Sequence, residues 1–110
     1  MCGIAGFFFR DAARTATLDE LKPMLDVIIH RGPDDWGYHL DGPLGFGMRR
    51  LNITDIETGQ QPVHNEDETV WIVFNGEIYN FVELRPMLEA KGHRFYTKGD
   101  TEVIVHLWEE

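Results

Sequence analysis

The chain opens with Met1-Cys-Gly-Ile-Ala-Gly-Phe-Phe-Phe9, a stretch that places its single cysteine directly behind the initiator methionine. Residues 4–9 are mostly apolar and aromatic, which predicts a short buried strand. The cysteine has two interpretations. As a residue of a chain terminus, Cys2 is a small hydrophobe without a special role. If Met1 is removed, as is common before a small residue, Cys2 carries a thiol and a free α-amino group, a nucleophile beside its own base.

The composition predicts one globular domain that binds neither nucleic acid nor a membrane. The chain has 110 residues, of which 43% are hydrophobic and 26% charged, and this suffices for a modest core. Acidic residues outnumber basic ones by 19 to 10, the formal net charge is −9, and no basic run is present to contact phosphates. No apolar stretch approaches the roughly 20 residues that span a bilayer, and no signal-peptide pattern is visible. A single cysteine forms no internal disulfide, which predicts a reducing, cytoplasmic location.

The remaining elements are predicted from periodicity and turn residues. Thr17-Leu-Asp-Glu20 has the form of a capping box, and apolar residues then recur at helical spacing up to Ile29, although Pro23 predicts a bend or a later regular start. Two further helices are expected, over residues 80–91 and from residues 100–101 onward. Strands are expected at residues 38–40, 44–53, 70–74 and 93–97, with a turn at 41–43 and a polar loop at 55–67. Hairpin-joined strands with inserted helices indicate an α+β layered domain.

Four separated stretches are distinctive in combination and in this order: Met1-Cys-Gly-Ile-Ala-Gly-Phe7, His30-Arg-Gly-Pro-Asp-Asp35, Val73-Phe-Asn-Gly-Glu-Ile-Tyr-Asn80 and Gly99-Asp-Thr-Glu102. Together they resemble the N-terminal glutaminase domain of the class II glutamine amidotransferases. Arg50-Leu-Asn-Ile-Thr-Asp55, followed by Gly59-Gln-Gln-Pro62, resembles the pattern of the glutamine-hydrolysing asparagine synthases. Met48-Arg-Arg50 and Phe74 stand where other branches typically have His-Thr-Arg and a histidine.

The resemblance implies an N-terminal-nucleophile hydrolase fold, which is an αββα sandwich. Residues 1–110 would then be a partial type 2 glutamine amidotransferase domain, because family members have a considerably longer glutaminase domain. The last predicted helix also stops at Trp108-Glu-Glu110 without a glycine cap. The sandwich is therefore expected to be truncated.

Hydrolysis of the glutamine side-chain amide needs a nucleophile, a base, an oxyanion site and a grip on the amino-acid end. The resemblance assigns the first two to the thiol and α-amino group of Cys2, and the oxyanion site to the Asn75 side chain and the Gly76 backbone N–H. Arginine binds a carboxylate through two parallel hydrogen bonds. The motif selects Arg50 for the glutamine α-carboxylate, which leaves Arg49, on the opposite face of the strand, as a surface charge. The other residues implied in glutamine binding are Asn52, Ile53, Glu77 and Asp100.

Three of these assignments have structural alternatives. Asn75-Gly76 is also a common turn, Asp100 is also a helix N-cap, and Glu77 is also an ordinary exposed acid. The histidines predict no metal site, because none lies at metal-ligand spacing from another histidine or from the cysteine. They are His30, His39, His64, His93 and His106.

The implied function is the glutaminase half-reaction of an asparagine synthase, in which glutamine is hydrolysed to glutamate. Ammonia would pass to a C-terminal synthetase domain absent from this sequence, where ATP and magnesium support conversion of aspartate to asparagine. No cofactor is expected in the present segment. Two alternatives stay open: a catalytically silent segment that binds glutamine or acts as an interaction module, and a glutaminase with a different ammonia acceptor. A homodimer is also left open.

Overall fold

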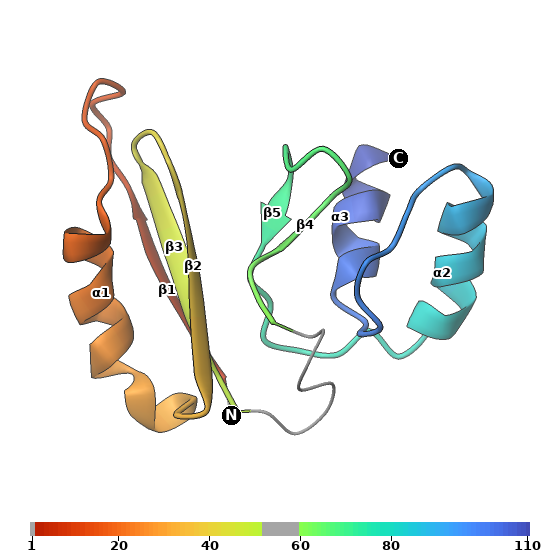
Figure 1. Ribbon diagram of the computed structural model, residues 1–110, viewed down its shortest axis with the longest axis horizontal. Coiled ribbons are helices and arrows are strands. Elements are labelled where there is room, and N and C mark those ends of the chain that lie inside the picture. Colours follow the sequence, from red (N-terminus) through yellow and green to blue (C-terminus); the bar gives the residue numbers. More distant parts are fainter. Residues whose placement is uncertain (1, 52–59) are drawn as a thin grey trace.

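The predicted first strand is present, but the prediction that it is buried is wrong: it is the edge of an antiparallel sheet, and Ile4 is 53% and Phe8 69% exposed. The computed structural model describes residues 2–51 and 60–110. Strand β1 (Gly3–Phe8) pairs with β3 (Leu44–Arg50), and β3 pairs on its other side with β2 (Asp35–Asp41), so the strand order is β1-β3-β2. Helix α1 (Leu18–Val27) covers one face of this sheet (Figure 1).

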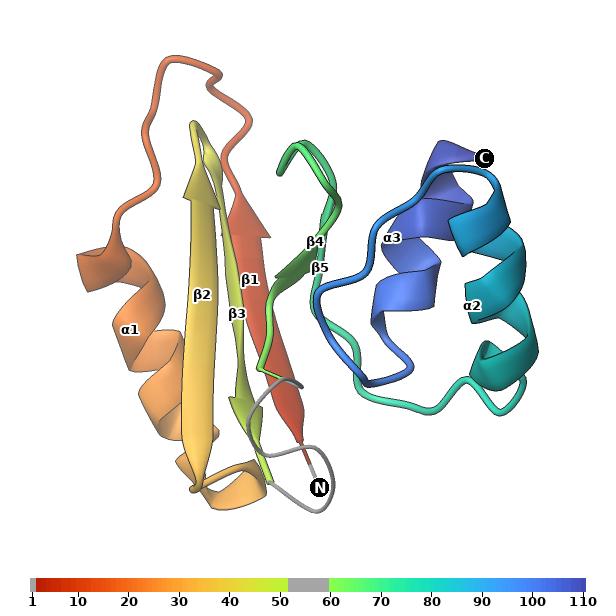
Figure 2. The same ribbon diagram turned by 45° about the vertical axis from the view of Figure 1, so that its right-hand side comes forward.

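The second part of the chain lies against the other side of the sheet. A two-stranded ribbon, β4 (Val63–His64) with β5 (Trp71–Ile72), follows the sheet, and α3 (Glu102–Glu109) and α2 (Phe81–Ala90) lie beyond it. The same order is visible after rotation in Figure 2. The described elements are therefore arranged as helix, sheet, ribbon and helix pair, which confirms the α+β class.

Helix α1 is built as the sequence predicts at its start and differs at its end. The Thr17 backbone N–H donates to Glu20 Oε1 at 3.2 Å, as expected in a capping box, and Pro23 lies inside the helix. Leu21 and Leu25 are fully buried against the sheet. The helix ends at Val27, and residues 29–31 form a short 3₁₀ helix instead of continuing the α-helix. The apolar spacing alone extended the predicted helix too far.

Two glycines of the β2–β3 hairpin permit a tight link and a close backbone contact. Gly42, in the two-residue link between β2 and β3, has a φ of +55°, a left-handed conformation that other residues adopt at a cost. The turn predicted at residues 41–43 is confirmed. A Cβ on Gly37 of β2 would collide with the carbonyl oxygen of Gln61. The segment that leads into β4 therefore lies directly on β2, and this contact brings the second part of the chain against the sheet.

The prediction that Arg49 is a solvated surface charge is wrong. Its side chain is 6% exposed and points toward α1. The guanidinium pairs with Asp26 at 2.7 Å, donates to the carbonyl of Leu25 at 3.1 Å and lies over the Trp36 ring. Arg49 donates a hydrogen bond to a backbone carbonyl in the last turn of α1, and it therefore holds this helix against β3. The alternation along β3 was correct, since Arg50 lies on the other face.

Three predicted strands and one predicted loop also differ from the structure. Residues 93–97 are not a strand, because three of their backbone N–H groups bond to side-chain carboxylates and the His93 N–H bonds to the Leu88 carbonyl. Tyr96 and Thr97 donate to Glu102, and Arg94 donates to Glu66. The strand predicted at 70–74 is confined to β5, and the predicted loop at 55–67 contains β4. The predicted strand at 44–53 ends at residue 50, and residues 52 and 53 lie outside the described part.

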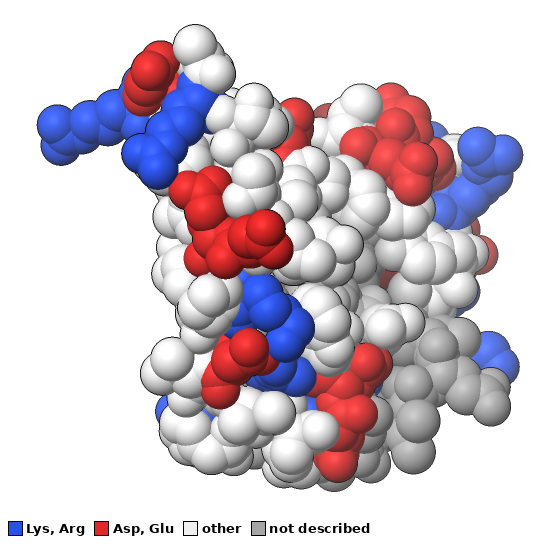
Figure 3. Space-filling view, turned by 60° about the vertical axis from the view of Figure 1, so that its left-hand side comes forward, with Lys and Arg blue, Asp and Glu red and all other residues white. Residues whose placement is uncertain are grey.

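The surface of the α1 side mixes both signs of charge. Figure 3 shows acidic and basic side chains interspersed on this face, without a continuous basic stripe. Lys22 pairs with Asp26 at 2.6 Å and Arg14 with Glu20 at 3.2 Å. In residues 2–51 and 60–110, no helix has the length and apolar character needed to cross a membrane.

Candidate active site

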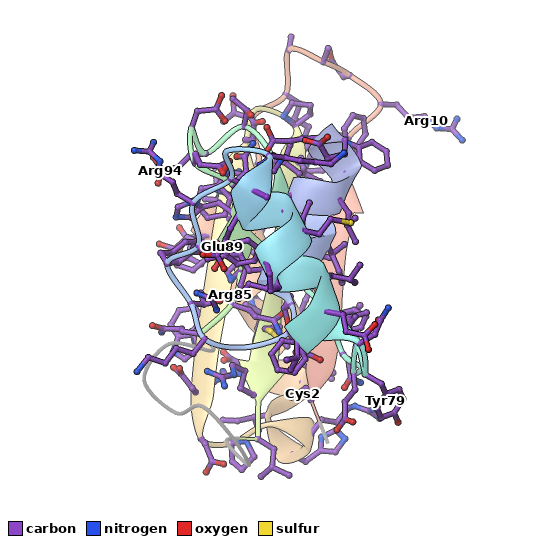
Figure 4. The ribbon with its side chains drawn as sticks, turned by 90° about the vertical axis from the view of Figure 1, so that its right-hand side faces the viewer. Cys2, Arg10, Tyr79, Arg85, Glu89 and Arg94 are labelled. Carbon is purple, nitrogen blue, oxygen red and sulfur yellow. The ribbon has the colours of Figure 1, made fainter. Side chains whose placement is uncertain are left out.

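The predicted site residues meet in one cavity. It has a volume of about 670 Å³ and is bounded by the chain's first residues, the end of β3, the segment after β5 and the segment before α3. Six of the eight predicted residues line it: Cys2, Arg50, Asn75, Gly76, Glu77 and Asp100. The other two, Asn52 and Ile53, lie outside the described residues. Figure 4 shows Cys2 and Tyr79, another lining residue, at the same end of the molecule.

Cys2 is held at the cavity by its backbone. It is half-buried and directly precedes β1. Its carbonyl oxygen accepts hydrogen bonds from Asn75 Nδ2 and from Arg31 Nε, each at 3.2 Å. Two of the other motifs, around Arg31 and around Asn75, therefore reach the residue that carries the thiol. Neither contact uses the sulfur, which is left to react.

Asn75 and Gly76 are positioned by a residue whose role the sequence did not reveal. Gln61 Nε2 donates to the carbonyl of Phe74 at 3.0 Å, and the Phe74 N–H donates back to Gln61 Oε1 at 2.6 Å. The Gln61 residue is only 8% exposed, so its amide acts in place of a neighbouring strand. This paired contact fixes the backbone immediately before Asn75. The sequence shows Gln61 within Gly59-Gln-Gln-Pro62, but only the fold reveals that it contacts Phe74.

Asn75-Gly76 does not form a hydrogen-bonded turn, the alternative that this dipeptide also offered. Gly76 does not have a positive φ, and the next element is α2 and not a strand. A Cβ on Gly76 would come within 2.7 Å of the Phe74 ring, so a side chain here would displace that ring. The glycine therefore allows the backbone to follow the cavity wall beside Asn75.

Asp100 joins the two segments that face Cys2. Its Oδ2 atom accepts a hydrogen bond from the Ile78 N–H at 2.7 Å. The N-cap of α3 is Thr101, and no side-chain hydrogen bond caps this helix. The alternative of Asp100 as the helix N-cap is therefore wrong. Its carboxylate instead ties residues 99–101 to the segment that carries Gly76.

The cavity offers charges of both signs. Arg50, at the end of β3, is 7% exposed, so its guanidinium is largely shielded from water. Asp100 is half-buried. Glu77 is exposed and also lines the cavity, and its role in glutamine binding stays a prediction. A cation and an anion around one cavity match the two charges of an α-amino acid. The described side chains with the geometry to hold a metal ion lie elsewhere: Glu66, His93, His106 and Glu109.

A half-buried cysteine, an amide donor, an arginine and an aspartate thus line one cavity. The family model described as "Glutamine amidotransferase domain" matches residues 1–110. The chain belongs to the glutamine amidotransferase family.

The relatives that the chain matches are much longer than it is. It is 56% identical over 107 residues to asparagine synthetase [glutamine-hydrolyzing] 1 of Bacillus subtilis, covering 96% of this chain and 17% of the relative. It is 50% identical over 112 residues to asparagine synthetase [glutamine-hydrolyzing] 2 of the same species, covering 100% and 15%. With the asparagine synthetase [glutamine-hydrolyzing] of Zea mays it shares 43% identity over 110 residues, covering 100% and 18%. The chain thus spans about a sixth of the length of these relatives.

Proposed function

We propose that the chain carries the glutaminase half-reaction of an asparagine synthase. The observation that supports this most strongly is the single cavity lined by Cys2, Asn75, Gly76, Arg50 and Asp100. The names of the similar proteins point the same way, since each is a glutamine-hydrolysing asparagine synthetase. The ammonia then passes to a synthetase domain outside this sequence, which is where ATP and magnesium act.

The reaction begins at the sulfur of Cys2 once Met1 is removed. Sγ attacks the side-chain carbonyl carbon of glutamine while its proton moves to the α-amino group of the same residue. This amino group is suited to the task because its ordinary pKa of about 7.7–8.0 leaves part of it neutral near pH 7. The carbon–nitrogen bond then breaks, and the amino group returns the proton to the departing ammonia. Water cleaves the resulting thioester, which releases glutamate and restores the thiol.

Asn75 and Gly76 stabilise the negative oxygen of the tetrahedral intermediate. The Asn75 amide already points to the backbone of the cysteine residue, since it donates to the Cys2 carbonyl at 3.2 Å. A donor held in place before the reaction spends no energy on reorientation as charge develops. The Gly76 N–H is the second donor, and the lack of a side chain lets the substrate reach it.

Arg50 and Asp100 hold the amino-acid end of glutamine. The Arg50 guanidinium binds the α-carboxylate, and Asp100, with Glu77 beside it, binds the α-ammonium. Asn52 and Ile53 are further candidates for contacts to the substrate. Burial of Arg50 strengthens its pairing, because charge interactions grow as water is excluded.

We also propose that the fold is part of an N-terminal-nucleophile αββα sandwich. The succession of α1, the three-stranded sheet, the β4–β5 ribbon and the α2–α3 pair supports this layering. Residues 1–110 form a partial type 2 glutamine amidotransferase domain in this account. Cytoplasmic location and the absence of nucleic-acid and membrane partners stay predictions.

The substrate role of Arg50 is tested by Arg50→Lys. Lysine keeps the charge but loses the two parallel hydrogen bonds, so we expect KM for glutamine to rise at least tenfold while kcat falls less than threefold. Arg10→Lys serves as the control, because Arg10 projects from the end of the molecule opposite Cys2 (Figure 4). Glutamate release is measured over a range of glutamine concentrations. An unchanged KM would remove Arg50 from the substrate site, and no glutamate release by the unaltered, Met1-free protein would reject the proposed function.

A further inference from the structure

Four potential metal ligands converge away from the Cys2 cavity. Glu66 follows β4, His93 follows α2, and His106 and Glu109 lie on α3. One ligand atom from each lies within 4.8 Å of the other three. None of the four residues lines the Cys2 cavity. The loop between β4 and β5 and the C-terminal end of α3 lie at one end of the molecule in both ribbon views, whereas Cys2 lies near the other end.

His106 directs an unbonded nitrogen into this cluster. The residue is fully buried, and its Nε2 atom lies 2.9 Å from Glu102 Oε2. Glu102 also accepts the backbone N–H groups of Tyr96 and Thr97, so this carboxylate is an acceptor and Nε2 is the donor. In the neutral ring Nδ1 then carries the lone pair. This Nδ1 makes no hydrogen bond to any residue that the structure describes.

The oxygens nearest to that nitrogen are acceptors as well. Glu66 Oε2 lies 3.3 Å and Glu109 Oε1 3.8 Å from His106 Nδ1. The Arg94 backbone N–H donates to Glu66 Oε2 at 2.9 Å, which identifies this carboxylate oxygen as an acceptor. A neutral imidazole lone pair facing two carboxylates is unfavourable, so this site takes up either a proton on Nδ1 or a metal cation between the three groups.

His93 also directs its Nδ1 atom into the cluster, but this nitrogen, unlike that of His106, has a hydrogen-bond partner in Glu66 Oε2. Its Nε2 atom lies 2.6 Å from Glu110 Oε2, and its Nδ1 atom lies 3.2 Å from Glu66 Oε2 and 3.9 Å from Glu109 Oε1. In each histidine Nε2 contacts a carboxylate outside the cluster, and Nδ1 faces the cluster. Histidines that bind metals have this arrangement, in which an outer carboxylate orients the ring and makes it a better ligand.

We propose that Glu66, His93, His106 and Glu109 bind one Zn²⁺ ion. Two imidazole nitrogens and two carboxylate oxygens make a four-ligand set of the kind that zinc takes in tetrahedral sites, whereas magnesium and calcium take oxygen ligands. Glu102 and Glu110 are the outer carboxylates. The ion would tie α3 to the segments after β4 and α2, which is a structural role separate from glutamine hydrolysis.

This inference departs from the expectation of no metal drawn from histidine spacing. His93 and His106 are separated by a loop and the first half of α3, and Glu66 comes from another part of the chain. Spacing rules detect ligands that are close in sequence. The fold is what brings these four together.

The test is a zinc titration of metal-stripped protein that carries Cys2→Ala, so that the thiol does not compete for the ion. We expect one equivalent of Zn²⁺ to bind. Co²⁺ in its place should give the intense visible absorption of a four-coordinate ion. His93→Gln and Glu109→Gln should each weaken Zn²⁺ binding at least tenfold. Glu89→Gln and His30→Gln, at exposed positions outside the cluster, should leave it unchanged.

Absence of stoichiometric binding would overturn the proposal, and so would zinc affinity that neither cluster substitution lowers. In that case protons on the two histidines neutralise the carboxylates, and the cluster is a network of ion pairs. Circular dichroism verifies folding of each variant. Should His93→Gln fail to fold, Glu109→Gln decides the result, because the Glu109 side chain is 33% exposed and is tolerant of substitution.

Discussion

Cys2→Ala is expected to abolish glutamine hydrolysis, with kcat falling by a factor on the order of 10⁴–10⁶, as when other covalent nucleophiles are removed. No other cysteine is present to replace it. The fold should tolerate the change, because the thiol is half-buried and both hydrogen bonds at this residue reach its backbone carbonyl. The affinity for glutamine should stay within about threefold, since Arg50 and Asp100 remain.

Two measurements separate these effects. Glutamate release reports the chemical step, and calorimetric titration with glutamine reports binding by the inactive variant. A Cys2→Ala protein that retains more than about 1% of the activity would exclude the thiol as nucleophile. If Cys2→Ala failed to fold, the test would use Cys2→Ser, whose side chain has nearly the same shape. A large fall in kcat for Cys2→Ser would then support the thiol as nucleophile.

Asn75→Asp is expected to lower kcat by about 10²–10³, the loss typical of one oxyanion donor. The substitution preserves the size of the side chain but replaces its N–H donors with a second acceptor oxygen, which repels the developing charge. KM should change less than threefold, because Asn75 acts on the intermediate and not on the amino-acid end. Steady-state kinetics on the same preparations measures both constants.

A suitable control for Asn75 is Asn80→Asp. Asn80 precedes α2 and is exposed, and its side chain makes no capping bond to that helix. Its substitution should leave both constants unchanged. If Asn75→Asp lowered kcat less than tenfold, or raised KM in proportion, the oxyanion assignment would be wrong and Asn75 would serve only to hold the Cys2 backbone.

The sequence predicted most of the cavity because its residues belong to short motifs that are recognisable without the fold. Asn75-Gly76 and Asp100 come from separate stretches of the chain, and the resemblance of these stretches, in this order, to the class II glutamine amidotransferases implied a shared site. Local patterns also predicted β1, the start of α1 and the turn at 41–43, because capping residues, apolar runs and glycine act over a few residues.

What the sequence could not predict depends on contacts between distant segments. Residues 93–97 are rich in strand-forming side chains, but the N–H groups of Tyr96 and Thr97 bond to Glu102 instead of to a neighbouring strand. The burial of Arg49 depends on where α1 ends, and the role of Gln61 depends on its meeting Phe74. In each case a side chain makes a hydrogen bond with a backbone group that a local reading of the sequence would pair with another backbone group.

The central claim is that the free α-amino group of Cys2 is the base, and one measurement tests it most directly. The protein is prepared with a cleavable N-terminal extension, so that proteolysis leaves Cys2 as the first residue, and glutamate release is assayed before and after cleavage in the same sample. Mass spectrometry gives the fraction cleaved. The account predicts less than about 1% of full activity before cleavage and activity in proportion to the cleaved fraction afterwards. Full glutaminase activity in the uncleaved protein, where that nitrogen is in a peptide bond, would contradict it.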